Sequence, residues 1–237
     1  MAQRKRRLMA LIVAVLIAGA GALYEHVSTK PADFNDSIVQ SSVTDGQPGS
    51  PAVEVLEKLA VKGRAPKTGY TRAQFSDGWA DAPGCNVRNY ILKRDMTAVI
   101  TKSETDCTVA QGTLQDPYTG KTLTFVNTNS SAVQIDHVIA LSNAWQTGAQ
   151  QLTPESRLSF ANDSLNLLAV DGPANQQKSD ADAATWLPPN KDYRCRYIAR
   201  QIAVKQKYTL WVTQAEHDAM KRVLDGCPGQ VLPIVTP

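Results

Sequence analysis

The sequence predicts an α+β domain that is mostly helical and contains a small strand–strand–helix unit. Two short stretches rich in β-branched and aliphatic residues, 132–139 and 166–170, are typical of strands. A tight Asp-Gly-Pro turn and a helical stretch at 174–186 follow the second strand directly. The chain also has four cysteines, which suit two disulfides in an exported protein. We therefore expect a disulfide-stapled α+β domain whose strand–strand–helix core spans about 132–186.

Residues 1–23 predict an export signal. Four basic residues at 4–7 precede an uncharged apolar run at 8–23, which contains small residues suited to cleavage. Because the run is a little shorter than the roughly 20 residues of a comfortable membrane span, a cleaved signal and an uncleaved anchor are both open. Either form predicts a secreted protein or one on the extracellular face of the membrane, which it contacts only through this segment.

A tether and one folded domain follow the signal. Residues 24–50 contain Pro31, Pro48 and several Ser, Asp and Gly residues, a composition typical of a flexible linker. Residues 51–230 then predict a single domain of ordinary size. Beyond the central unit, hydrophobic spacing predicts helices at 52–59, 89–96, 143–149, 154–161, 192–206 and 214–225, and a strand at 121–126.

The cysteines are even in number and enter an oxidising compartment, so we expect two disulfides. Three pairings are open for four cysteines. We predict Cys85–Cys107 and Cys195–Cys227, because each of these closes a local loop. The chain has no CxxC motif, which argues against zinc ribbons and thioredoxin-like redox chemistry.

Charge argues against a globally basic nucleic-acid binder. The chain has 25 basic and 22 acidic residues, and setting aside the four basic residues at 4–7 leaves 21 basic against 22 acidic. Attraction to phosphate must therefore be local. The candidate region lies between Trp186 and Lys207, where helical spacing places Arg196 and Arg200 on one face. A phosphate-binding stripe and an ordinary solvated helix face are both compatible with this pattern.

Polar residues gather around the strand–strand–helix unit. Asp136-His137 lies at or near the end of the first strand, Asn166 begins the second, and Asn175 lies in the helix with Lys178 behind it. A lone histidine is usually structural, but phosphodiester hydrolysis requires a base near neutral pH and a hard cation, and this set supplies candidates for both. Carboxylate and amide oxygens are suited to Mg²⁺ or Mn²⁺.

Three segments carry a resemblance to a known family. They are Ile135-Asp136-His137-Val138, Ser164-Leu165-Asn166-Leu167-Leu168 and Asn175-Gln176-Gln177-Lys178-Ser179-Asp180. In this order they resemble the HNH (ββα-metal) endonucleases, and most closely the branch of the GmrSD C-terminal nuclease domain in an exported bacterial form. Other segments, Asp116-Pro117-Tyr118-Thr119-Gly120 among them, extend the resemblance over roughly 52–227.

The resemblance implies a role for each site residue. His137 would be the general base, Asp136 and Asn175 would bind the metal, and Asn166 would hold the loop that orients His137. An oxygen-only ligand set favours Mg²⁺ over zinc or nickel. Cleavage would leave 5′-phosphate and 3′-hydroxyl ends. From its charge, we add Lys178 as a phosphate contact.

We therefore expect an exported, metal-dependent endonuclease acting on DNA, with RNA as an alternative substrate and no protein partner evident. No base-reading module accompanies the motif, which argues for weak or no sequence preference. The rival hypothesis is a catalytically silent exported module that binds a polyanion. A third hypothesis is hydrolysis of another phosphodiester, such as a wall polymer. The chain has no GxSxG, Walker A or GxGxxG motif, which argues against serine hydrolases and nucleotide-binding enzymes.

Overall fold

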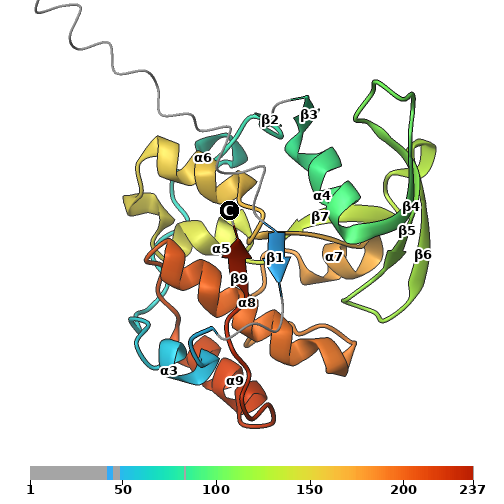
Figure 1. The fold of residues 1–237 in the computed structure, drawn as a ribbon. Coiled ribbons are helices and arrows are strands. Elements are labelled where there is room, and N and C mark those ends of the chain that lie inside the picture. The colour runs from blue at the N-terminus through green and yellow to red at the C-terminus, as the bar shows by residue number, and fades with distance from the viewer. Residues whose placement is uncertain (1–41, 45–48, 83, 237) are drawn as a thin grey trace, which may run out of the picture. The chain divides into compact units, whose positions relative to one another are not determined.

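The computed structural model describes residues 42–44, 49–82 and 84–236 (Figure 1). The predicted signal at 1–23 and most of the predicted tether at 24–50 lie outside the described residues. Within the tether range, β1 (Ser42–Thr44) pairs antiparallel with β9 (Ile234–Thr236), so this part is a strand. None of the helices in the described ranges has the length and apolar character of a membrane span.

Two antiparallel strands, β7 (Val133–His137) and β8 (Leu167–Asp171), form a hairpin, and α7 (Gly172–Lys178) follows β8 directly. The register pairs Asp136 with Leu168 and His137 with Leu167. One face of the hairpin packs into a helical core and the other into a core beneath a second sheet. Because both faces are buried, β8 has a continuous apolar run rather than an alternating pattern.

The second sheet consists of β4 (Met96–Thr101), β5 (Val109–Gln115) and β6 (Thr122–Val126), in antiparallel order. Helix α4 (Val87–Asp95) and a short hairpin of β2 (Asp81–Ala82) and β3 (Cys85–Asn86) precede it. Apolar side chains of α4, this sheet and the β7–β8 hairpin share one core: Val87, Ile91, Leu92, Met96, Val109, Leu114, Phe125, Val133, Ile135, Leu167 and Ala169.

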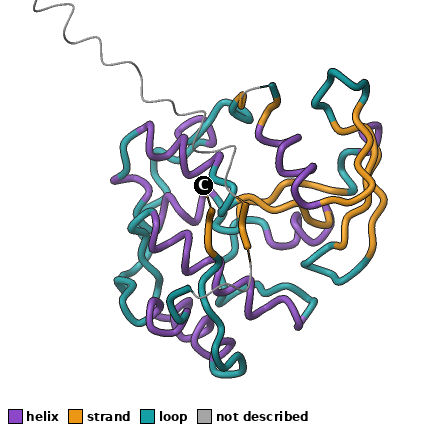
Figure 2. The backbone as a smooth tube through the Cα atoms, viewed as in Figure 1, coloured by secondary structure: helices purple, strands orange, loops and turns teal. Residues whose placement is uncertain are grey.

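The remaining helices build the other core. They are α3 (Ala52–Leu56), α5 (Leu141–Gln146), α6 (Pro154–Asn162), α8 (Arg194–Lys207) and α9 (Gln214–Leu224). In Figure 1 these helices lie on one side of β7 and the three-stranded sheet lies on the other, and Figure 2 shows the same separation of helix and strand. Ordinary sequence signals start two of them: Thr153 caps α6 ahead of Pro154, and Thr213 forms a capping box with Glu216 in α9.

Both predicted disulfides are confirmed. Cys85–Cys107 joins β3, just before α4, to the segment that precedes β5. Cys195–Cys227 joins the first turn of α8 to the segment that follows α9. Each therefore fastens one of the two cores.

Some element predictions were wrong in extent, and two strands were missed. The helix predicted at 174–186 ends at Lys178, because Ser179 adopts a left-handed conformation (φ 51°) and Asp182 then stabilises turns instead. Residues 143–149 form α5 and a separate 3₁₀ turn, Ala149–Gln151. Strands β4 and β5 were not predicted, because α4 passes into β4 at Met96 without a turn signal.

Candidate active site

A cavity of about 480 Å³ opens beside the end of β7. Asp136 and His137, the last two residues of that strand, line it together with Asn175 of α7. Lys67 and Arg72 line the same space from the segment before β2. The fold thus brings the adjacent Asp136 and His137 to one cavity with the sequence-distant Asn175, and two cationic side chains lie beside them.

The imidazole of His137 is 7% exposed and is held on two sides. Its Nε2 lies 2.8 Å from the carbonyl oxygen of Ala161, and the Trp79 ring stacks on it at 5.7 Å. Because a carbonyl only accepts, Nε2 carries the proton and Nδ1 keeps its lone pair. Burial lowers the pKa of His137 to about 3, so the ring is neutral at neutral pH. This arrangement leaves Nδ1 as a proton acceptor.

The carboxylate of Asp136 is 5% exposed and already has two hydrogen-bond donors. The Tyr118 hydroxyl donates to Oδ2 at 2.5 Å, and the Lys178 ammonium donates to Oδ1 at 3.0 Å. Burial raises the pKa of Asp136, while the charge of Lys178 opposes that shift. An ionised carboxylate offers about four lone-pair positions, so two oxygens with one donor each retain acceptor capacity.

Asn175 supplies the other expected metal ligand. Its helix begins at an Asp171 N-cap, which accepts a hydrogen bond from the Ala174 amide. The Asn175 Nδ2 donates to Gln134 Oε1 at 2.9 Å, and among the described residues none donates to its carboxamide oxygen. Nor do the described ranges gather three or more His, Cys, Asp or Glu side chains at a metal-binding spacing. Two oxygen donors facing one cavity still fit Mg²⁺, which completes its shell with water and substrate phosphate.

Asn166 is buried behind the end of β7. Its Oδ1 accepts from the Ile139 amide at 2.8 Å, and its own carbonyl accepts from the Val138 amide. Its Nδ2 donates to the carbonyls of Ile139 and Phe160. These bonds fix the backbone immediately after His137, the kind of contact that the resemblance implied for this residue.

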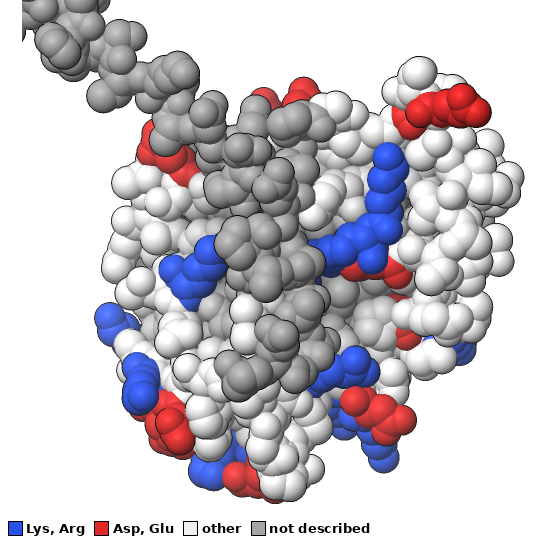
Figure 3. Space-filling view, viewed as in Figure 1, with Lys and Arg blue, Asp and Glu red and all other residues white. Residues whose placement is uncertain are grey.

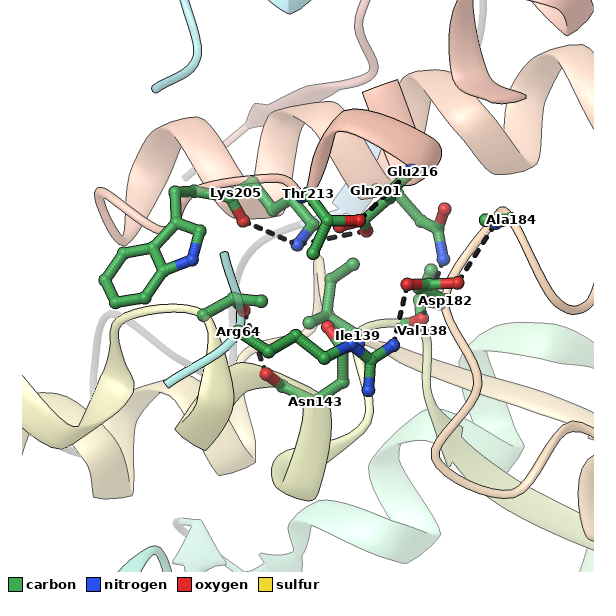
Figure 4. Close-up of polar contacts among 12 residues, drawn as sticks. Arg64, Val138, Ile139, Asn143, Asp182, Ala184, Gln201, Lys205, Thr213 and Glu216 are labelled. Carbon is green, nitrogen blue, oxygen red and sulfur yellow. Dashed lines mark hydrogen bonds and ion pairs between the residues drawn. The ribbon is translucent and has the colours of Figure 1, made fainter. Parts of the chain in front are cut away.

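Polar contacts hold the segment after α7, and Figure 4 shows those of Asp182. Arg64 pairs with Asp182 at 2.7 Å, and Asp182 also accepts from the Ala184 amide. Asp180, which precedes Asp182 in the chain, lines the cavity and accepts hydrogen bonds from Lys67 and Ser142. These hydrogen bonds lower the pKa of Asp180. Asp180 and Ser142 therefore form part of the cavity wall, whereas Arg64 and Asp182 line a neighbouring pocket.

Two of the cations predicted to bind phosphate are instead buried and bind oxygen atoms inside the protein. Lys178 is fully buried on Asp136 and the His137 carbonyl, so it does not face a substrate. Arg200 is 6% exposed and donates to the backbone carbonyls of Ser164, Leu165 and Leu167. Of the two arginines predicted to share a helix face, Arg196 is exposed, with its guanidinium carbon 5.2 Å from the centre of the Tyr193 ring. Figure 3 likewise shows Lys and Arg in separate groups among acidic residues on the face it displays.

Sequence reasoning missed three residues of the site: Trp79, Tyr118 and Arg72. Tyr118 lies in the turn at 116–120, whose likeness to the family was a usable signal without an assigned role. Trp79 and Arg72 lie in the turn-rich region before β2, which has no motif. Arg72 is exposed, and its charge contributes to lowering the pKa of His137.

Comparison with known proteins identifies the family. The family model for the C-terminal domain of GmrSD restriction endonucleases matches residues 86–223. The chain belongs to this family. The GmrSD match contains Asp136, His137, Asn166 and Asn175, whereas Trp79 and Arg72 precede it. Membership in a restriction-endonuclease family points to endonuclease-type activity and to a nucleic acid as substrate.

A relative from the fungus Arthroderma benhamiae is 40% identical over 181 residues, which cover 75% of this chain and 85% of that protein. It is named only an uncharacterized secreted protein. No solved structure matches this chain. The family expected from the three sequence segments is therefore confirmed, and the GmrSD-type domain has a relative described as secreted.

Proposed function

We propose that this GmrSD-type protein is an exported, metal-dependent HNH endonuclease that hydrolyses phosphodiester bonds of DNA, with RNA as an alternative substrate. In this proposal β7, β8 and α7 form the ββα-metal core. The supporting observation is the single cavity that Asp136, His137 and Asn175 line together. These residues supply a base and two hard oxygen donors, the minimum set for metal-assisted hydrolysis.

His137 would act as the general base. The hydrogen bond from Nε2 to the Ala161 carbonyl holds the tautomer in which Nδ1 accepts a proton from the attacking water. Stacking on Trp79 restricts rotation of the ring, and the contacts of Asn166 hold the backbone beyond it. After attack at phosphorus, the proton of the attacking water would reside on Nδ1, the P–O bond to the 3′ oxygen would break, and that oxygen would take a proton from solvent water.

Asp136 and Asn175 would hold Mg²⁺ or Mn²⁺. When bound, the ion neutralises the charge that develops on the leaving oxygen. Tyr118 and Lys178 would orient the Asp136 carboxylate toward the cavity. Breakage at the 3′ oxygen predicts 5′-phosphate and 3′-hydroxyl ends.

Arg72 would bind the phosphate in place of the buried Lys178. It lines the cavity near His137, and in the described part of the chain its guanidinium contacts no carboxylate. Lys67, in contrast, is already paired with Asp180 at 3.1 Å. Arg196 is exposed and stays a predicted contact for the nucleic-acid backbone.

The experiment is a plasmid-degradation assay with Mg²⁺, with EDTA, and with His137→Ala. We expect EDTA to abolish cleavage and His137→Ala to reduce the rate by roughly 10²–10⁴-fold, the usual contribution of a general base. His217→Ala is the matched control, because this histidine lies on α9 near Glu57 and Asp218 rather than at the cavity. Metal-independent cleavage, or equal rates for His137→Ala and the control, would contradict the assignment.

One observation favours a second candidate, the catalytically silent polyanion-binding module: the Asp136 carboxylate is already paired with Lys178. For that function, nucleic acid would bind in a salt-dependent manner without turnover under Mg²⁺, Mn²⁺, Ca²⁺ or Zn²⁺. Turnover in any of these metals decides for the enzyme.

A further inference from the structure

The expected metal-binding carboxylate already has a cationic partner inside the protein. Lys178 Nζ lies 3.0 Å from Asp136 Oδ1 and 2.9 Å from the His137 carbonyl oxygen. The side chain of Lys178 is 0% exposed and that of Asp136 is 6% exposed. The ammonium therefore cannot move into solvent without leaving a buried carboxylate unpaired, which is strongly unfavourable.

This pairing removes the charge that would attract a metal. Asp136 contributes one negative charge, Lys178 cancels it, and Asn175 is neutral. A divalent ion bound to the same carboxylate would also lie close to the ammonium, and two buried positive charges repel each other with little screening by water or salt. The protein ligands alone thus give an approximately neutral site for a dication.

A phosphodiester supplies what the protein lacks. Each phosphate carries one negative charge and non-bridging oxygens, and Mg²⁺ is commonly held by one or two protein oxygens together with substrate phosphate. Arg72 and Lys67 line the cavity where such a phosphate would lie beside Asp136 and Asn175. The substrate phosphate would therefore bring both the missing negative charge and the missing oxygen ligands into the cavity.

We propose that Lys178 makes metal binding dependent on nucleic acid: the site takes up a divalent ion only jointly with a phosphodiester. This inference rests on the proposed function for the identity of the metal ligands. Because linkage is reciprocal, the metal must strengthen nucleic-acid binding by the same factor by which nucleic acid strengthens metal binding. Free Mn²⁺ at concentrations that support cleavage would leave the empty enzyme unoccupied.

Mn²⁺ binding measured by calorimetry on the disulfide-bonded protein tests the proposal. His137→Ala serves as the background so that cleavage of a short DNA duplex is slow on the time scale of the titration. We expect at least about tenfold tighter Mn²⁺ binding with the duplex than without it, a change large enough to measure reliably. Equal affinity with and without the duplex overturns the proposal, and this comparison requires no change at Lys178.

The variant Lys178→Met, in the same His137→Ala background, removes the ammonium while retaining roughly the volume of the side chain. We expect it to bind Mn²⁺ without DNA at least roughly tenfold more tightly, because no ammonium then competes with the ion for the carboxylate or repels it. Mn²⁺ should also raise its Tm more than that of the parent, since the ion replaces the lost partner. Lys221→Met is the matched control: it removes one lysine that is paired with Asp225 at 2.7 Å, on α9 and away from the cavity. A purely structural lysine would leave Mn²⁺ affinity unchanged or lower, and that result overturns the proposal.

Failure of this inference differs from failure of the proposed function. Absence of Mn²⁺ binding even with the duplex bound contradicts metal-dependent hydrolysis, and with it this proposal. Tight Mn²⁺ binding to the empty protein, together with DNA cleavage, overturns only the role of Lys178. Joint binding without any cleavage by the wild-type protein supports the coupling and contradicts the enzyme.

Discussion

Tyr118 and Asp116 connect the turn at 116–120 to Asp136 and to the start of the helix that carries Asn175. Its hydroxyl donates to Asp136, and the neighbouring Asp116 carboxylate accepts from the backbone amide of Asp171, the N-cap of the helix that carries Asn175. The ring is fully buried among Trp186, Tyr193 and Tyr197. One short turn therefore sets the relative positions of Asp136 and α7.

The variant Tyr118→Phe removes the hydroxyl and retains the ring. We expect roughly tenfold weaker Mn²⁺ binding in the presence of DNA, the lower end of the effect of losing a partner of a metal ligand. Calorimetry in the His137→Ala background measures this Mn²⁺ affinity. With His137 intact, kcat and KM of Tyr118→Phe show whether the rate of cleavage falls as well.

Tyr208→Phe is the control, because Tyr208 makes an equivalent hydrogen bond to Asp163 at 2.8 Å without lining the cavity. Equal metal affinity for the two variants would show that Tyr118 contributes only packing.

At this scale, the sequence could predict the residues of a motif but not the direction of a side chain. Asp136, His137 and Asn175 were identified because their chemistry is local to short segments, and the fold brings them to one cavity. Lys178 and Arg200 were assigned to phosphate from charge alone, and both are buried on internal oxygens. Contacts such as that of Trp79 with His137 join segments with no shared pattern, so no local signal predicts them.

Among the elements, α8 and α9 were predicted almost to the residue, because each has a clear amphipathic spacing and α9 has a capping box. Between them lies a fully buried ion pair, Lys205 with Glu216 at 3.1 Å (Figure 4). Burial raises the pKa of Glu216, while Lys205 opposes that shift. The Lys205 ammonium also donates to the Trp211 carbonyl, so it ties both helices to the segment between them.

Glu216→Gln should destabilise the protein by about 3–5 kcal/mol, because it leaves the Lys205 charge buried without its partner. The double variant Lys205→Met with Glu216→Leu should recover most of that loss, since it removes both charges and retains volume. Denaturant unfolding with intact disulfides measures both. A single-variant loss below about 1 kcal/mol would contradict a buried, desolvated pair.

At the scale of the molecule, the described residues form two cores that share the β7–β8 hairpin, and two arginines join these cores through one loop. Arg94 of α4 and Arg200 of α8 both donate to the carbonyl oxygens of Ser164 and Leu167. These carbonyls flank Asn166, so the loop that fixes the backbone after His137 is held from both sides. No sequence pattern predicts such a junction, because the two helices contribute single residues to it from distant parts of the chain.

A double-mutant cycle of Arg94→Met and Arg200→Met tests whether the two arginines are coupled in their contribution to the free energy of unfolding. Each single variant leaves the other guanidinium on the same two carbonyls, so we expect losses of about 1.5–3 kcal/mol, typical of hydrogen bonds to a charged group. The double variant removes both guanidinium donors from those carbonyls, and its loss should exceed the sum of the single losses by at least about 1 kcal/mol. Denaturant unfolding gives the free energies, and plasmid cleavage by each single variant shows whether the Asn166 loop still positions His137. If the loss of the double variant equals the sum of the single losses within about 0.5 kcal/mol, each arginine stabilises the loop independently, and the loop does not couple the two cores.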